Sequence, residues 1–396
     1  MNLSNRALFL RHVAQTSPFP PMLEVMHAEG CFVTDVQGKK YIDFISGISV
    51  SNLGHRHPSV LQAIYQQLDK YMHVMVYGEF IQTPQVDLAL SIASLLGEPF
   101  ESVYFVNSGS ETVEGAMKLA KRATGRTEFI SCENSYHGSS HGPLSLMGAE
   151  TFKTAYRPLL PGMRRIRFNN LSDLNYINSN TAAVLVEPVQ GEAGAINGDQ
   201  QWLESLRETC NQTGTLLIFD EIQSGFGRTG KAFAFQHSGV VPDIVLMAKG
   251  MGGGLPIGAF ASSKDLMSKL SYDPLLGHIT TFGGNAVCAA ASLAVVREIN
   301  RPELLSNVQN ISNRIKSKLI HPDIFEIRGK GLLLAMKLES NERALKVMNA
   351  CYDLGLITDW FLFADDCLRL APPLIITPDE ADLACEILLK AISATA

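Results

Sequence analysis

The feature of this chain that most constrains its fold is an alternation, between residues 58 and 299, of short apolar runs with longer amphipathic ones. Several short runs are apolar at every position, which is typical of strands covered on both faces. The alternation predicts a mostly parallel α/β sheet, on which ligands gather beyond the carboxyl ends of the strands. The predicted strands are Val103–Val106, Glu128–Cys132, Ala182–Glu187, Thr215–Asp220, Asp243–Met247 and Ile257–Ala261, and the predicted helices include 58–71 and 110–123.

The last hundred residues follow a different pattern. A final helix is predicted after Thr377, because a proline at its first turn and Glu380 complete a capping box. We expect a large domain over 58–299 and a smaller α+β domain over 300–396, which the N-terminal segment 1–57 joins. The elements predicted in the smaller domain are helices near 303–319 and 341–354 and strands Leu332–Leu338 and Leu368–Leu370.

Composition excludes several classes of function. The chain has 33 basic and 39 acidic residues, a net charge of −6, and no long run of Lys or Arg, which argues against nucleic-acid or anionic-membrane partners. It shows no secretory signal and no apolar run of the roughly 20 residues that span a bilayer. The seven cysteines are scattered without a C-x-x-C pair or a histidine at ligand spacing. They predict buried thiols in a reducing, cytoplasmic compartment and no metal site.

Polar residues follow the predicted strand Val103–Val106 at the point where a helix begins. The run Asn107–Glu111 places Gly109 among the free N–H groups of the first helical turn, an arrangement suited to phosphate. Ser108 and Glu111 are also compatible with a plain capping box.

Two further strand ends carry ionisable residues. Asp220 and Glu221 close an apolar strand, and buried carboxylates need a partner, either a salt bridge with a residue such as Arg228 or a cationic ligand atom. Lys249 follows the strand Asp243–Met247 and precedes a glycine run. A lysine near a strand end is usually solvated, but desolvation at this position would lower its pKa and make its neutral amine available.

A fourth turn, Thr280–Asn285, precedes another helix and offers a second anion site. Together the four strand ends supply a reactive amine, a carboxylate for a ring nitrogen and two phosphate-binding turns. That set is what pyridoxal phosphate requires, because a lysine forms the Schiff base and a carboxylate keeps the pyridine nitrogen protonated. We therefore expect pyridoxal phosphate as the cofactor, held by Lys249 and Asp220.

The run Leu216–Gly230, with Lys249 placed 29 residues after Asp220, resembles the class III (ω-amino acid type) aminotransferases. The resemblance extends from about Tyr41 to Pro373. It implies the α/β fold type I of pyridoxal-phosphate-dependent transferases, with a large mostly parallel-sheet domain and a smaller α+β domain. It also implies a homodimer with active sites at the interface.

The resemblance assigns roles to individual residues. Lys249 is implied as the Schiff-base lysine and Asp220 as the partner of the pyridine nitrogen. The other implied cofactor-binding residues are Ser108, Gly109 and Ser110 at the phosphate, Thr281 reaching it from the neighbouring subunit, Tyr136 with its neighbour His137 and Ile222 at the ring faces, and Gln223 at the ring hydroxyl.

Three further residues are implied at the substrate. Glu187 and Glu192 match the two active-site glutamates of the family, and Arg369 matches a carboxylate-binding arginine that Glu192 masks or releases. Such a pair lets one pocket accept an ω-amine and then a dicarboxylic oxoacid.

The chain departs from the family at one position. Acetylornithine, ornithine and 4-aminobutyrate aminotransferases carry an arginine after the motif His137-Gly138, and this chain has Ser139. Either another cation binds the substrate carboxylate, or the amino donor lacks a carboxylate at that end.

The expected activity is a ping-pong transamination from an amino donor, of the acetylornithine, ornithine or 4-aminobutyrate type, to a 2-oxoacid such as 2-oxoglutarate. Freed Lys249 would carry the proton at the substrate carbon. A racemase, an aminomutase or a decarboxylase would keep the same cofactor residues, but the Glu192–Arg369 pair favours transamination.

Two other motifs indicate different classes of enzyme. The segment 225–232 is nearly a P-loop, but it ends in Ala232, which lacks the hydroxyl that ligates magnesium. The segment 138–142 fits the G-x-S-x-G pattern of serine hydrolases, but Ser140 lies well beyond the preceding strand and Pro143 follows closely. An NTPase and a serine hydrolase are therefore remote alternatives.

Overall fold

The computed structural model describes residues 3–76 and 78–395, which leaves the extreme ends of the predicted segments 1–57 and 300–396 outside the described residues. Its largest sheet has seven strands in the order β4-β12-β11-β10-β7-β5-β6. These are β4 (Ser102–Val106), β12 (Gly258–Ser262), β11 (Ile244–Met247), β10 (Leu216–Asp220), β7 (Thr181–Val186), β5 (Glu128–Cys132) and β6 (Met163–Ile166).

The prediction of a mostly parallel α/β sheet is confirmed, with one strand reversed. Neighbouring strands from β11 to β6 run parallel, whereas β12 is antiparallel to both β11 and β4. The turn between β11 and β12 holds Lys249. The strand β12 pairs with β4 in the opposite direction, so Gly258 at the start of β12 lies opposite Val106 at the end of β4. The start of β12 is therefore next to the turn that follows Val106.

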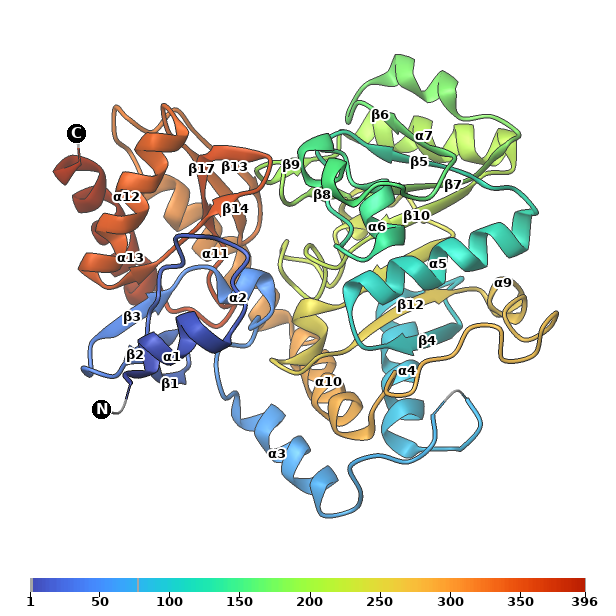
Figure 1. The fold of residues 1–396 in the computed structure, drawn as a ribbon, viewed down its shortest axis with the longest axis horizontal. Helices are drawn as coiled ribbons and strands as arrows, with labels where there is room; N and C mark the ends of the chain where they lie inside the picture. Colours follow the sequence, from blue (N-terminus) through green and yellow to red (C-terminus); the bar gives the residue numbers. More distant parts are fainter. Residues whose placement is uncertain (1–2, 77, 396) are drawn as a thin grey trace.

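Alternate residues of the central strands face two different cores. Along β10, Leu217 and Phe219 belong to one apolar cluster, and Ile218 belongs to the other. This division follows from the two-residue period of a strand, and it explains why these runs are apolar at every position. The helix α5 (Gly109–Thr124) covers one face, and Figure 1 shows it lying across the sheet.

Two four-stranded sheets form the other part of the molecule. One has the order β13-β14-β17-β16 and the other the order β1-β2-β3-β15. In the second sheet β15 (Leu356–Ile357) pairs in parallel with β3 (Lys40–Asp43), so the two ends of the chain share a sheet. Figure 1 shows the blue N-terminal strands beside the red C-terminal helices. The remaining strands are β1 (Val25–Glu29), β2 (Phe32–Asp35), β13 (Glu326–Lys330), β14 (Leu333–Lys337), β16 (Trp360–Phe361) and β17 (Ala364–Leu370).

Predicted helices of this part are present. The helices α11 (Pro302–Lys318) and α12 (Asn341–Leu354) lie where the apolar spacing places them. The capping box at α13 (Pro378–Ala394) is confirmed, because Thr377 Oγ1 accepts from Glu380 N and Glu380 Oε2 accepts from Thr377 N. In the larger part, α3 (Pro58–Leu68) ends before residue 71, so that prediction was three residues too long.

Several elements were not predicted individually. Among them are β6 and the helices α4 (Thr83–Leu96), α7 (Gln200–Thr213) and α10 (Ala286–Ile299). The strand β6 contains two arginines and therefore lacks the apolar pattern of its neighbours, which is tolerated because it is the last strand of the sheet. Across 3–76 and 78–395, no helix is both long and apolar enough to cross a membrane.

Candidate active site

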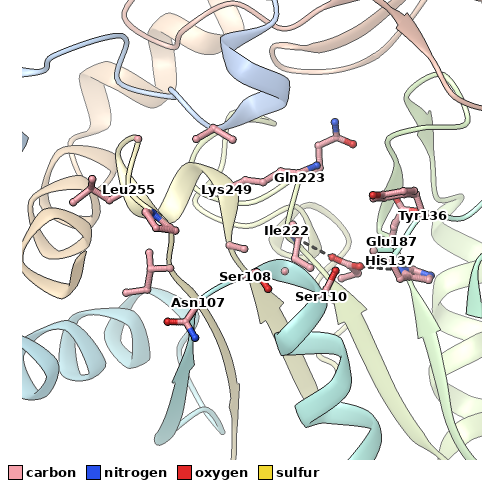
Figure 2. Close-up of a pocket in the computed structure, with 18 residues that line it drawn as sticks. Asn107, Ser108, Ser110, Tyr136, His137, Glu187, Ile222, Gln223, Lys249 and Leu255 are labelled. Carbon is pink, nitrogen blue, oxygen red and sulfur yellow. Dashed lines mark hydrogen bonds and ion pairs between the residues drawn. The ribbon is translucent and has the colours of Figure 1, made fainter. Parts of the chain in front are cut away.

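A cavity of ≈ 440 Å³ opens at the carboxyl ends of β5, β7, β10 and β11, as expected for a parallel sheet. Its volume is in the range of small-molecule and cofactor sites. Figure 2 shows Lys249, Ile222 and the turn with Tyr136 and His137 around the same space. Ten of the predicted site residues line it: Ser108, Gly109, Ser110, Tyr136, His137, Glu187, Asp220, Ile222, Gln223 and Lys249.

The first turn of α5 forms one end of the cavity. Ser108 is the N-cap, and its hydroxyl accepts from Glu111 N at 3.3 Å. The capping box is only half formed, because the Glu111 carboxylate accepts from Asn107 N, at 2.6 Å, instead of from Ser108 N. Gly109 and Ser110, the first two residues of α5, line the cavity, and the helix dipole favours an anion there.

Glycine keeps the Ser110 hydroxyl accessible. A Cβ on Gly138 would lie 2.2 Å from Ser110 Oγ, and the φ of Gly138 is +124°, which L residues rarely adopt. The space at this helix start therefore depends on the absence of a side chain at 138. A phosphate group fits the donors and the room that these residues provide.

Asp220 is buried at the end of β10 and is fixed by two contacts. Its Oδ2 lies 2.8 Å from His137 Nδ1, and its Oδ1 accepts from Ile222 N at 3.0 Å. His137 is also buried, and its Nε2 has no hydrogen-bond partner among the described residues. A buried carboxylate held in this way suits a protonated ring nitrogen, which a pyridine cofactor would supply.

The alternative of a salt bridge between Arg228 and Asp220 or Glu221 is not found among the described contacts. The buried Arg228 guanidinium donates to Leu332 O, Pro372 O and Asn52 Oδ1, and burial lowers its pKa to about 9.

Glu221 points away from the cavity. It accepts from Ser224 Oγ and from the backbone N–H groups of Ala234 and Phe235. Burial, the largest cause, raises its pKa to about 7. Adjacent carboxylates on one strand end therefore serve different surroundings, one facing the cavity and one supporting the following turns.

Lys249 lies two residues beyond β11, at the start of a 3₁₀ turn over Lys249–Gly252. Its φ of +46° is in the left-handed region, which costs free energy for a residue with a side chain. The alternative of a solvated lysine does not hold, because the side chain lines the cavity and burial lowers the pKa of its amine. Glu192 opposes that shift and Arg369 adds to it.

Glu187 is buried beyond β7. Its Oε1 accepts from Tyr136 N at 3.1 Å and its Oε2 from Gly191 N at 2.9 Å. Burial is the largest cause that raises the pKa of Glu187, to about 7, and Asp220 adds to the shift. Glu187 therefore fixes the turn that carries Tyr136.

Arg369, on β17, forms a buried ion pair with Glu192. Arg369 Nη1 lies 2.9 Å from Glu192 Oε1, and Nη2 lies 3.1 Å from Oε2. Glu192 Oε1 also accepts a hydrogen bond from Gln223 Nε2 at 3.5 Å. The pairing expected from the resemblance is therefore present, and through Gln223 it contacts the lining of the cavity.

Two residues of this region escaped the sequence interpretation. Asp359 binds the remaining edge of Arg369, with Oδ1 2.9 Å from Nε. Gly191 makes room for Gln223, because a Cβ there would fall 1.6 Å from Gln223 Oε1. The available signals were a carboxylate next to the apolar pair Trp360–Phe361 and a glycine inside the run Glu187–Gly194.

Three predicted site residues do not line the cavity: Thr281, Glu192 and Arg369. Thr281 is exposed in the loop before α10 and is not among the residues that line the cavity of this chain. Ser139 is exposed beside the cavity, and its Oγ lies 3.1 Å from Tyr136 Oη. Among the described residues no group of His, Cys, Asp or Glu is arranged to hold a metal ion.

The rival motifs lack the structures they require. The segment 225–232 is a series of turns followed by the four-residue helix α8 (Phe235–Ser238), and it contains the buried Arg228. Ser140 is the N-cap of α6 (His141–Leu146), and its hydroxyl donates to Glu114 Oε1 at 3.3 Å. Neither segment forms a triphosphate cradle or a nucleophile elbow.

An amine with a lowered pKa, a carboxylate held by a histidine and an anion-binding helix start converge at one sheet edge, the arrangement of a pyridoxal-phosphate enzyme. The chain belongs to the class III aminotransferases, because the family model "Aminotransferase class-III" matches residues 13–392. It is therefore an aminotransferase with pyridoxal phosphate as cofactor, of the acetylornithine/ornithine aminotransferase type.

Its relatives agree in sequence and in structure. The chain is 39% identical over 392 residues to an acetylornithine aminotransferase of Methanosarcina mazei, with 96% of this chain and 94% of the relative covered. It superposes on the ornithine aminotransferase of Toxoplasma gondii with a TM-score of 0.91 and 28% identity over 99% and 96% of the two chains. An amine transaminase from an uncultivated Pseudomonas species, solved with pyridoxal phosphate bound, gives a TM-score of 0.88 and 27% identity over 97% and 100%.

Proposed function

We propose that this aminotransferase moves an ω-amino group from a donor to a dicarboxylic 2-oxoacid such as 2-oxoglutarate, in two half-reactions at one cavity. The observation that carries the proposal is the buried ion pair of Arg369 with Glu192 beside the cavity. A carboxylate that pairs bidentately with an arginine can be exchanged for a substrate carboxylate of the same geometry. An ω-amine is accepted while the pair is closed, and the oxoacid is accepted when Glu192 leaves.

Bound pyridoxal phosphate supplies a ring that accepts electron density from the substrate carbon. Lys249 holds the cofactor and, once released, moves the proton at that carbon through its neutral Nζ, which the lowered pKa favours. Asp220, held by His137, keeps the ring nitrogen protonated. The remaining cofactor contacts are Ser108, Gly109 and Ser110 at the phosphate, Tyr136 and Ile222 at the ring faces and Gln223 at the ring hydroxyl.

At the position where the family resemblance implies an arginine for the donor's carboxylate, this chain has a serine hydroxyl. Ser139 and Tyr136 present two hydroxyls to each other there, 3.1 Å apart. Because neither is a cation, we propose a donor whose far end is uncharged or is bound by polar groups instead of an arginine. Acetylornithine and ornithine are the first amino donors to test.

We also propose that the enzyme is a homodimer in which Thr281 reaches the phosphate of the partner subunit. Large apolar side chains are exposed near the Thr280–Gly283 turn: Phe282 is 57% exposed, Ile81 94% and Leu90 70%. A groove next to them is lined by Phe80, Ile81, Thr280 and Gly283. A contiguous apolar surface of this kind is typical of an interface, and a second copy would bury it and bring Thr281 to the phosphate turn.

The dimer is tested by sedimentation of the holoenzyme. Ile81→Glu is expected to weaken the dimer and to lower cofactor retention together, because it places a charge in the interface. Ile320→Glu is the matched control, since Ile320 is 79% exposed on the other part of the molecule. A monomeric holoenzyme, or an Ile81→Glu dimer of unchanged affinity, would overturn the proposed surface.

The chain is further proposed to work as two cytoplasmic domains, a large one over 58–299 and a small one over 300–396 that segment 1–57 joins. The pairing of β3 with β15 supports the joining. All seven cysteines are free thiols, and six of them are buried, which supports a reducing compartment.

The function is tested by half-reactions of the yellow holoenzyme against a panel of amines with and without a carboxylate at the far end. Loss of cofactor absorbance with an ω-amine, and its return with 2-oxoglutarate, is the expected result. Borohydride should fix the cofactor to Lys249. An enzyme that reacts only with α-amino groups would refute the ω-amine proposal.

A further inference from the structure

The guanidinium of Arg369 has three donor nitrogens, and two different carboxylates accept from them. Nη1 and Nη2 donate to Glu192, and Nε donates to Asp359 Oδ1 at 2.9 Å. Nη2 also reaches Trp360 O at 3.4 Å. A guanidinium can bind a carboxylate through Nη1 and Nη2 or through Nε and Nη2. Here Asp359 occupies Nε, so the Nη1–Nη2 side that Glu192 holds is the side left for exchange with a substrate carboxylate.

The hairpin of β16 and β17 fixes Asp359 opposite Arg369. Arg369 N donates to Asp359 O at 2.8 Å, and Thr358 Oγ1 donates to Arg369 O at 2.8 Å. The ring of Phe361 lies under the guanidinium, with its centroid 4.4 Å from Cζ. The backbone pairing of the hairpin therefore places the Asp359 carboxylate at Nε. Glu192 comes from the loop after β8 (Val189–Gln190), and the tip of the same hairpin donates to it from Leu362 N and Phe363 N.

Charge gives Asp359 a second part in this arrangement. Arg369 is 1% exposed, so its guanidinium would be costly to leave without a counter-ion. When Glu192 withdraws, Asp359 still provides one. The pKa of Asp359 is raised by burial, and Arg369 opposes that shift, as expected for a carboxylate whose ionised form depends on this arginine.

We propose that Asp359 is a positioning residue for the oxoacid half-reaction, which holds the Nε edge of Arg369 so that only the Nη1–Nη2 edge passes between Glu192 and the substrate carboxylate. The proposal rests on the proposed function, in which Arg369 binds the oxoacid. The donor half-reaction proceeds with Glu192 on Arg369, where two carboxylates already orient the guanidinium. Loss of Asp359 therefore affects the two half-reactions unequally.

The experiment measures both half-reactions of the holoenzyme in single turnovers. Asp359→Ala removes the acceptor at Nε, and we expect the concentration of 2-oxoglutarate at half-maximal rate to rise about tenfold or more, as for a lost hydrogen bond to a charged group. The limiting rate should change less than about threefold. Constants for the amine donor should stay within about twofold, because Glu192 still orients Arg369.

Asp359→Asn separates geometry from general stability. Asparagine keeps an oxygen that accepts from Nε but has no charge, so it should restore the oxoacid constant in part, to a value between those of the wild type and Asp359→Ala. The matched control is Asp365→Asn, which removes an exposed carboxylate from the same hairpin. If Asp359→Ala does not yield folded enzyme, Asp359→Ser replaces it, because a serine hydroxyl is one bond too short to take the place of Oδ1.

Each result decides between the two proposals. If Arg369→Ala leaves the oxoacid constant unchanged, the proposed function of Arg369 fails. If Arg369→Ala raises it but Asp359→Ala or Asp359→Ser does not, only the role of Asp359 fails. An equal change in both half-reactions, or no recovery in Asp359→Asn, would make Asp359 a structural residue and overturn the positioning role.

Discussion

The cofactor side and the substrate side that we propose for the cavity are built in different ways. The cofactor side consists of residues 108–110, 136–137, 220–223 and Lys249, which follow strands of one sheet. The substrate side consists of Glu192, Asp359 and Arg369, which come from two sheets and bind one another through charge. Strand ends fixed by a common sheet form a rigid cradle, whereas one guanidinium shared by two carboxylates can change partners. A transaminase needs both, because one cofactor must serve two unlike substrates.

Replacement of Lys249 should give the largest effect on the cofactor side. Lys249→Ala removes the amine that we propose holds the cofactor and carries the proton, so turnover should fall by at least about 10⁴-fold. The variant should still bind pyridoxal phosphate without a covalent bond, since the other contacts remain. Borohydride labelling followed by mass spectrometry checks both points, with the exposed Lys264→Ala as control. Turnover near the control's would break the assignment of Lys249.

Asp220→Ala should have the next largest effect. It removes the carboxylate that faces the ring nitrogen and leaves His137 Nδ1 without its partner at 2.8 Å, so the rate should fall by about 10³-fold. Single-turnover rates measure this with both substrates, and the loss should be similar in the two half-reactions because the ring serves both. A loss confined to one half-reaction would place Asp220 on the substrate side instead.

Glu192→Gln should change selectivity more than rate. Without the negative charge, Arg369 is no longer masked, so the preference for an ω-amine over glutamate should fall by about tenfold. The ratio of the two donors' kcat/KM measures the effect. An unchanged ratio would mean that the substrate side does not switch, and the contrast with the rigid cofactor side would be lost.

The smallest effect is expected at Glu221, which lies next to Asp220 and affects how stability changes with pH. Burial raises the pKa of Glu221 to about 7 in the folded chain, so the folded state binds more protons than the unfolded state between pH 4.5 and 7. Glu221 thus makes the apoenzyme less stable as pH rises through that range. In Glu221→Gln the fall in Tm from pH 5 to 7 should be smaller by about 2 °C. The exposed Glu101→Gln should behave as the wild type.

The cofactor side was more predictable from the sequence than the substrate side. Asp220, Lys249 and the turn at Gly109 could be recognised because each stands next to its strand, and a sheet collects strand ends at one edge. The Glu192–Arg369 pair was expected only through the family resemblance. Asp359 was missed because its partner is set by the pairing of β16 with β17, which local apolar spacing does not specify.

The differences between the sequence interpretation and the structure have physical causes as well. Arg228 was considered as a partner for Asp220 or Glu221 because buried charges seek opposite charges. The fold instead surrounds it with carbonyl groups from residues 332 and 372, more than a hundred positions away. The reversed direction of β12 was equally invisible, since an apolar strand has the same composition in either direction.

The pairing of β3 with β15 affects how the chain can fold while it is being synthesised. Ile42 pairs with Leu356, so the N-terminal sheet cannot be completed until the ribosome has added the 314 residues that follow Ile42. At ribosomal speeds of roughly 5–20 residues per second, that interval is about 15 to 60 seconds. During this interval the seven-stranded sheet and its helices can fold, while β1, β2 and β3 still lack β15, the fourth strand of their sheet. We expect the nascent N-terminal strands to be the part of this chain that most depends on chaperones.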